Sequence, residues 1–359
     1  MNRHLLHLLV PPLALAVLGV LSNAPAALGP GMWGLAVPAL VLAVLSTVHH
    51  AEVVAHRTGE PLGTLILALA VTVIEVALIL AFMTGGSPNG AQVARDTLFA
   101  AIMIICNGVV GLCLLLGGLR HREQSFRVDG VGPAMATLVA LSTLSLVLPT
   151  FTTSSPEGTY TAAQLLFVCL SSAVLWLVFT FFQTVRHRDY FLPEADARNP
   201  SRHAQPPSTR TALWSLGAMV LGLLAVVGLA KSLTPLIESG VRALQAPASV
   251  VGIAIALLVL LPETLAALRA AQANRLQTSL NLALGSALAS IGLTIPAVVL
   301  VALWLGLPLT LGLQDKDLVL LVLTFAVGTL TLAHGRTSMM QGAVHLVIFA
   351  AFVLLALVP

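Results

Sequence analysis

Long apolar runs alternate with short polar connections along nearly the whole chain. A membrane-spanning helix needs about 20 predominantly apolar residues, with a range of roughly 17 to 25. Eleven segments are long enough to span a membrane, near residues 5–23, 33–49, 62–83, 97–119, 131–149, 161–184, 211–231, 247–268, 278–304, 317–333 and 341–358. They are too long and continuous for transmembrane strands. The pattern therefore predicts an all-α polytopic membrane protein with about 11 transmembrane helices.

The placement of lysine and arginine predicts the orientation of these helices. When the N-terminus is put in the cytoplasm, 13 of the 17 Lys and Arg residues fall in cytoplasmic loops and 4 in outside loops. This asymmetry is typical of membrane proteins, and it predicts a multi-pass protein of the cell inner membrane with a cytoplasmic N-terminus. The first apolar run could also be a signal peptide, but Pro25 disfavours cleavage after Ala24. We expect the first helix to be retained.

The only long polar segment is rich in proline and mixed charges, which predicts a cytoplasmic linker. It divides the chain into one leading helix and two sets of five. An odd number of helices per set means that the two sets enter the membrane in opposite orientation, as in many secondary transporters. The predicted parts are an N-terminal extra helix, a first five-helix repeat, the linker and a second five-helix repeat, at residues 1–30, 31–185, 186–210 and 211–359.

Composition excludes several other classes of protein. The chain is 58% hydrophobic and 9% charged, against about 25% charged residues in soluble domains. The net charge of +3 is small and its basic residues lie in short loops, so we expect the lipid bilayer and not a nucleic acid as a partner. Three cysteines, Cys106, Cys113 and Cys169, lie in apolar runs and form no CxxC motif. They predict neither a disulfide framework nor a metal cluster, and we expect no cofactor.

Two glutamates lie deep inside apolar segments and in similar settings. Glu75 comes twelve residues after Gly63, and Glu263 eleven residues after Gly252, each in the second helix of its predicted repeat. Burying a carboxylate in hydrocarbon costs a few kcal/mol or more, and burial favours its protonated form. A bound cation would restore the ionised form, so one site could exchange protons for cations. The alternative is that each glutamate only bonds a neighbouring helix.

Other polar residues could complete a site for cations and protons. Thr72 lies one turn before Glu75, and Asn107 lies in the following helix. Pro262, just before Glu263, frees a backbone carbonyl one turn earlier, and such oxygens suit hard cations. Asn281 and Ser286 lie on the helix after Glu263. Polar residues in membrane helices also serve as interhelical contacts, which is the competing interpretation for each of them.

Four further polar residues cluster just before the first glutamate motif. His49, His50, Glu52 and His56 do not have the His-Glu-x-x-His spacing of a zinc hydrolase. We interpret them as a solvated cytoplasmic rim whose histidines could respond to pH.

The sequence contains no signature of catalysis or of ATP-driven transport. It has neither a glycine-rich phosphate loop nor an evident pairing of a nucleophile with a base. We therefore do not expect an enzyme. Arg95 and Asp96 predict a local ion pair where a helix begins.

A resemblance to a known family is carried by residues 50–57, 59–61, 63–76, 95–98, 261–263, 281–286, 293–296, 335–337 and 342–346. Together these stretches resemble the calcium/cation antiporter superfamily, and in particular its bacterial Ca²⁺(Na⁺)/H⁺ exchangers of the ChaA type. The resemblance implies one extra helix followed by two inverted five-helix repeats. It also implies that Glu75 and Glu263 carry cations and protons, with polar helix positions at Asn281 and Ser286.

The chain departs from the wider superfamily next to both glutamates. Where the superfamily has a Gly-Asn pair, this chain has Val71-Thr72 and Val259-Leu260, so two amide ligands are missing. The sequence predicts a proton-coupled antiporter that exports Ca²⁺ in exchange for H⁺. The alternative is a Na⁺(K⁺)/H⁺ antiporter with little Ca²⁺ activity. A passive cation channel is a third interpretation, although a pore would carry polar residues along its whole length.

Overall fold

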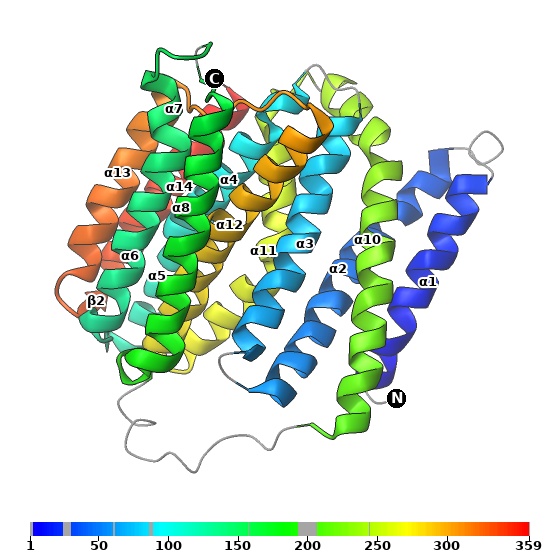
Figure 1. Ribbon diagram of the computed structural model, residues 1–359. Coiled ribbons are helices and arrows are strands. Elements are labelled where there is room, and N and C mark those ends of the chain that lie inside the picture. Colours follow the sequence, from blue (N-terminus) through cyan, green and yellow to red (C-terminus); the bar gives the residue numbers. More distant parts are fainter. Residues whose placement is uncertain are drawn as a thin grey trace. The chain divides into compact units, whose positions relative to one another are not determined.

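The computed structural model describes residues 3–23, 30–59, 62–85, 89–156, 158–192, 207–243 and 245–358. These residues form eleven continuous helices, some of them divided into successive labelled parts (Figure 1). The all-helical class and the eleven predicted segments are confirmed. Nine of the helices in the described part are long and apolar enough to cross a membrane. The predicted linker falls largely on residues 193–206, which lie outside the described residues.

The first half of the chain contributes six of the eleven helices. These are α1 (Arg3–Asn23), α2 (Pro30–Thr58), α3 (Leu62–Thr84), the continuous η1–α4–η2–α5 (Gly90–Gln92, Val93–Met103, Ile104–Val109, Val110–His121), α6–η3–α7 (Val128–Ser142, Thr143–Val147, Leu148–Phe151), and α8–η4 (Ala162–Phe181, Phe182–Arg186), followed by the short η5 (Arg188–Phe191). The segments η2, η3 and η4 are π-helical turns. Such turns insert an extra residue into a helix and often occur at functional sites.

The second half contributes the other five helices. These are α10 (Thr209–Ala243), α11 (Ser249–Gln272), α12 (Leu276–Leu305), α13 (Asp315–Leu332) and α14 (Met339–Leu357). Prolines lie inside α10, α11 and α12 without ending them. Membrane helices tolerate proline because neighbouring groups satisfy the freed backbone carbonyls.

The helices divide into two compact units. The first unit comprises residues 1–93 and 204–251. Within it, α10 packs along α2 and also contacts α1 and α3. The helices approach closely where a side chain is absent: a Cβ atom on Gly222 of α10 would lie 3.2 Å from Cβ of Thr47 on α2. The first helices of the two predicted repeats, α2 and α10, therefore pack against each other in this unit.

The second unit comprises residues 94–203 and 252–359, and its packing is reciprocal. The α5 segment packs on α14, and α12 packs on α8. Each contact joins the third helix of one predicted repeat to the fifth helix of the other. Both contain a close approach at glycine: a Cβ atom on Gly111 would lie 3.0 Å from Cβ of His345, and one on Gly292 would lie 2.6 Å from Cβ of Trp176. This exchange of partners is the one expected of two repeats related by a twofold axis.

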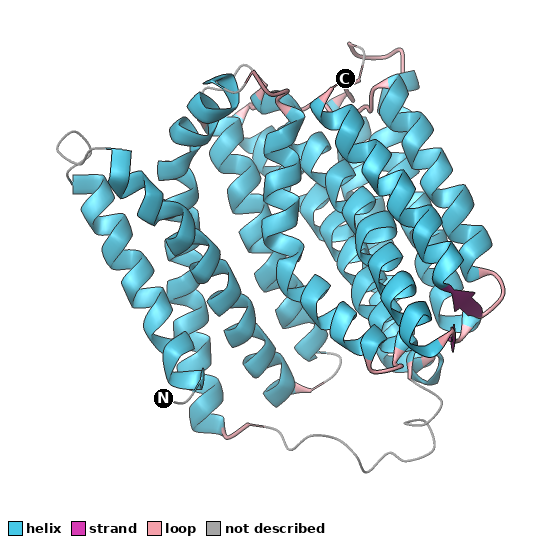
Figure 2. Cartoon of the chain, turned by 180° about the vertical axis from the view of Figure 1, so that it is seen from behind, coloured by secondary structure: helices cyan, strands magenta, loops and turns pink. Residues whose placement is uncertain are grey.

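A short pair of antiparallel strands closes one end of the helices of the second unit (Figure 2). Strand β1 (Glu123–Ser125) follows α5, and β2 (Arg336–Ser338) precedes α14. Gln124 of β1 is buried, and its Nε2 donates to the carbonyl of Ala271 (2.9 Å) at the end of α11. The strand pair thereby holds the C-terminal end of the helix that carries Glu263.

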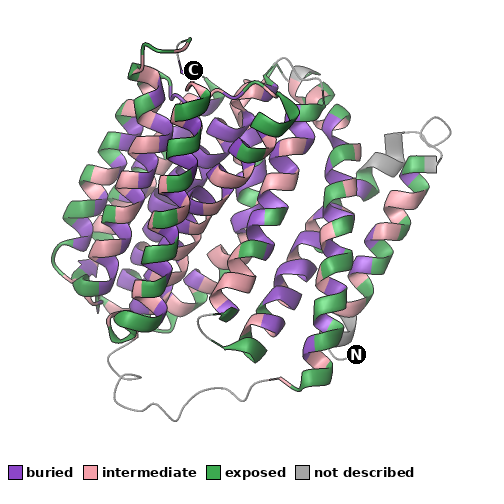
Figure 3. Ribbon diagram, in the orientation of Figure 1, coloured by how far each residue is buried: buried purple, intermediate pink, exposed green. Residues whose placement is uncertain are grey.

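The distribution of burial matches a protein surrounded by lipid. Within each unit, buried residues gather on the faces that helices turn toward one another (Figure 3). Large apolar side chains lie exposed on the outer faces of membrane helices, including Leu170, Val322 and Val347. Exposed apolar surface of this extent is typical of contact with acyl chains or a partner protein. The structure therefore supports a multi-pass membrane protein.

Candidate cation and proton site

Glu75 lies in the first unit on α3, with 1% of its surface exposed. Thr72, Glu75 and Ile79 are buried and recur at helical spacing, so they share one face of α3. This helix packs against α2 and α10, and its first turn approaches α2 closely because Gly63 has no side chain facing the Ala55 carbonyl. The predicted burial of Glu75 is confirmed, and Thr72 is buried one turn before it on the same face of the helix.

Glu263 lies in the second unit on α11 and is half-buried. Pro262 precedes it inside the helix, which continues unbroken to Gln272. Proline has no N–H group, so the carbonyl of Leu258 loses its usual helical donor. One turn along, the hydroxyl of Thr264 donates to the carbonyl of Leu260 (2.7 Å). This part of α11 therefore has a carboxyl group and a carbonyl without its regular partner, both of them hard oxygen ligands.

Asn107 is fully buried in the π-helical turn η2 of the second unit. Its Nδ2 donates to Oγ1 of Thr324 on α13 (2.9 Å), and its Oδ1 bonds Nδ1 of His345 on α14 (3.0 Å). Nε2 of His345 contacts the Thr331 hydroxyl (3.1 Å). The sequence singled out Asn107 as a candidate but not Thr324, His345 or Thr331. Two signals in the sequence could have found them: a histidine inside an apolar membrane segment, where ionisable side chains are costly and usually functional, and the resembling stretch 342–346.

Asn281 makes contacts at the beginning of α12. Its Nδ2 donates to the carbonyl of Phe191 in η5 (2.6 Å), and its Oδ1 accepts from Nε2 of Gln277 (2.9 Å). The Gln277 side chain in turn accepts from the backbone N–H of Arg127 (2.6 Å). Ser286, more than one turn further along α12, is half-buried. The structure therefore gives Asn281 partners in the connection after α8, while its role as a ligand stays a prediction.

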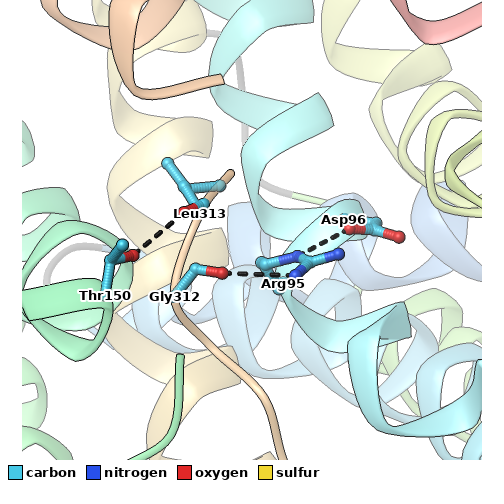
Figure 4. Close-up of polar contacts among 5 residues, drawn as sticks. All are labelled: Arg95, Asp96, Thr150, Gly312 and Leu313. Carbon is cyan, nitrogen blue, oxygen red and sulfur yellow. Dashed lines mark hydrogen bonds and ion pairs between the residues drawn. The ribbon is translucent and has the colours of Figure 1, made fainter. Parts of the chain in front are cut away.

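Arg95 and Asp96 form the predicted ion pair in the first turn of α4. Arg95 Nε lies 2.8 Å from Asp96 Oδ1, and its other arm donates to the carbonyl of Gly312 (3.2 Å) (Figure 4). The neighbouring Leu313 carbonyl accepts from the hydroxyl of Thr150 (2.9 Å). Both charged side chains are largely buried. A planar guanidinium that binds a carboxylate and a carbonyl together fixes the 306–314 connection onto α4.

The histidine cluster differs from the predicted solvated rim at one position. His50 is fully buried: its Nδ1 bonds Oγ of Ser215 (3.2 Å) and its Nε2 bonds the carbonyl of His7 (3.1 Å). His49 stacks on the ring of His7 at 4.2 Å. Glu52 and His56 are exposed, as expected. His50 is buried because α1 and α10 cover this end of α2, which the local sequence does not reveal. Within the described residues no group of three metal-binding side chains occurs.

Comparisons with known proteins agree with this architecture. The chain is 51% identical over 317 residues to y4hA of Sinorhizobium fredii, an ionic transporter by name, covering 88% of this chain and 86% of that protein. It is 36% identical over 352 residues to the sodium-potassium/proton antiporter ChaA of Escherichia coli, covering 97% and 94%.

Solved structures show the same fold at low sequence identity. The structure of native YfkE matches with a TM-score of 0.73 at 16% identity, covering 97% of both chains. The H⁺/Ca²⁺ exchanger CAX matches with a TM-score of 0.72 at 16% identity, covering 98% of this chain and 89% of that chain. The sodium/calcium exchanger protein family matches residues 28–185 and 214–358. The chain belongs to this family.

Proposed function

We propose that this protein is a proton-coupled cation antiporter in which Glu75 and Glu263 are the carriers. The observation that supports it most directly is the complete burial of Glu75 in an apolar helix. Each carboxyl group holds either a proton or part of a cation's ligand shell, because low-dielectric surroundings disfavour the bare carboxylate. Uptake of a cation therefore requires loss of protons, and this competition couples the two fluxes.

Oxygen groups on the glutamate helices and on the third helices of the two predicted repeats support the same proposal. On α3 the hydroxyl of Thr72 accompanies Glu75, and on α11 the Leu258 carbonyl accompanies Glu263. Asn281 is left out of this set, because Phe191 and Gln277 engage both ends of its amide. The third helices of the two repeats offer Asn107 in the first repeat and Ser286 in the second. All of these are hard oxygen donors, which suit Ca²⁺ and the alkali cations.

The proposed reaction is export of Ca²⁺ in exchange for H⁺. Two carboxyl groups can release two protons for one divalent cation, which would make the exchange electroneutral. A gradient of one pH unit supplies about 1.4 kcal/mol per proton. If the exchange is not electroneutral, each net charge adds about 2.3 kcal/mol per 100 mV.

A second candidate is Na⁺(K⁺)/H⁺ antiport with little Ca²⁺ activity. Two observations favour it: the 36% identity to a sodium-potassium/proton antiporter, and the absence of amide side chains at Val71-Thr72 and Val259-Leu260. Ca²⁺ takes six to eight oxygen ligands. A smaller number of ligands therefore weakens the binding of Ca²⁺ more than it weakens the binding of a monovalent cation.

Everted membrane vesicles from a host without its own antiporters test both candidates. After respiration has acidified the vesicle interior, Ca²⁺, Na⁺, K⁺ or Mg²⁺ is added and recovery of a pH-sensitive dye is followed. Glu75→Gln and Glu263→Gln are expected to abolish recovery while the protein remains folded in detergent. Glu123→Gln, an exposed glutamate on β1, is the matched control and should transport normally. Normal transport by Glu75→Gln or by Glu263→Gln would contradict the assignment of these residues as carriers. Cation flux that persists without a proton gradient would favour a channel.

A further inference from the structure

Four polar side chains form a buried chain of hydrogen bonds in the second unit that the proposed carriers do not explain. Asn107 lies in η2, Thr324 and Thr331 lie on α13, and His345 lies on α14. All four are buried, Asn107 and Thr324 at 0% exposure and His345 at 1%. Polar groups at membrane depth are costly unless satisfied, and an ionisable one is a candidate for function. The role of His345 follows from the direction of its bonds.

The direction of every bond in this chain is fixed by a backbone carbonyl at one end. The Thr324 hydroxyl lies 2.7 Å from the carbonyl of Leu320, which can only accept. Thr324 therefore donates there and accepts from the Asn107 amide, so Nδ2 of Asn107 faces Thr324. The amide oxygen then faces His345, whose Nδ1 must carry the hydrogen. In the neutral ring, Nε2 is then left to accept a hydrogen bond from the Thr331 hydroxyl.

The packing around His345 leaves its side chain little freedom to turn away. A Cβ atom on Gly111 would lie 3.0 Å from Cβ of His345, and one on Gly108 would lie 3.3 Å from the ring of Phe349. The backbones of α14 and of the η2–α5 segment are therefore pressed together on both sides of the Asn107 contact. Asn107 also lies in a π-helical turn, where the irregular backbone directs a side chain away from the regular helical positions.

We propose that His345 is a positioning residue for transport: its Nδ1–H holds the Asn107 amide in the orientation that cation binding requires. This proposal rests on the proposed function. A carbonyl oxygen has two lone pairs, so the bond from His345 occupies one and leaves the other for a cation. Groups that orient a ligand in this way typically change metal affinity or activity 10- to 100-fold when removed.

Two amide substitutions at position 345 separate this role from simple packing. The amide of Asn reaches the level of histidine Nδ1, whereas the amide of Gln reaches the level of Nε2. His345→Asn should keep a donor for Asn107 and remain close to wild type. His345→Gln should keep the Thr331 contact but lose the donor, and raise the cation concentration for half-maximal dye recovery about tenfold, with the maximal rate largely retained.

Two threonines on α13, Thr324 and Thr331, provide further test variants. Thr331→Val removes only the outer contact and should transport normally. Thr324→Val frees the other end of the Asn107 amide and should raise the half-maximal cation concentration as His345→Gln does. If the His345→Gln protein does not fold, Thr324→Val takes its place in the test. If the wild type is active and the Asn and Gln variants at 345 behave alike, the positioning role is overturned. If the wild type dissipates no gradient with any cation, the proposed function fails, and the positioning role fails with it.

Discussion

The side-chain amide of Asn281 donates a 2.6 Å hydrogen bond to the backbone carbonyl of Phe191. This contact ties the beginning of α12 to the connection that follows α8. Together with the bond from Gln277 to Oδ1 of Asn281, it engages both ends of the amide that the sequence marked as a candidate cation ligand.

Replacing Asn281 by Ala is expected to reduce stability more than cation affinity. Loss of a hydrogen bond to a buried partner costs about 1 to 3 kcal/mol, which should appear as a lower melting temperature of the detergent-purified protein. The half-maximal cation concentration in the vesicle assay should change less than about twofold, which is well under 1 kcal/mol. A large rise in that concentration at unchanged melting temperature would instead support the ligand role.

Thr72→Val is expected to weaken cation binding without unfolding the protein. The substitution keeps the shape of the side chain and removes the hydroxyl oxygen one turn before Glu75, on the same buried face. A hydrogen bond or dipole contact to a charged group is worth about 1.5 to 3 kcal/mol, so the half-maximal cation concentration should rise roughly tenfold. Thr84→Val, at the exposed end of the same helix, is the control. If Thr72→Val and Thr84→Val change the half-maximal cation concentration equally, Thr72 is not part of the cation site.

The sequence predicted those features that depend on local composition. Apolar length defines the helices, and the long apolar run around Glu75 is enough to predict its burial. The partners of Asn107 could not be predicted in this way, because they lie 217 and 238 residues away along the chain. The same holds for His50, whose burial depends on His7 and Ser215.

The β1–β2 pair was missed for a different reason. Each strand has only three residues, too few to show the alternation by which strands are recognised. Its function of holding the end of α11 depends on Gln124, a residue whose type gives no local signal.

Gly252 begins the second glutamate motif, and its lack of a side chain is expected to be essential for packing. A Cβ atom there would lie 2.7 Å from the carbonyl carbon of Asp96 and 2.8 Å from the backbone nitrogen of Thr97. Because backbone atoms cannot move aside easily, Gly252→Ala should lower stability by about 1 to 3 kcal/mol. Gly217→Ala on α10, where no atom lies within 4 Å of the added Cβ, should be neutral or stabilising by up to about 1 kcal/mol. Comparable melting temperatures for the two variants would contradict the close approach.

Tyr160 is expected to make the stability of the protein sensitive to alkaline pH. It lies between α7 and α8, its hydroxyl donates to the carbonyl of Leu144 (2.7 Å), and burial raises its pKa from 10.0 to about 12. The folded state therefore holds this proton more tightly than the unfolded state. The resulting stability is fully present below pH 10 and is lost as the pH rises toward 12.

Tyr160→Phe lacks the hydrogen bond, so it should melt at a lower temperature than wild type at pH 8, and the difference should narrow at pH 10.5 and above. All other titrating groups are common to both proteins. If the difference in melting temperature stays constant across this range, the fold does not raise the pKa of the Tyr160 phenol.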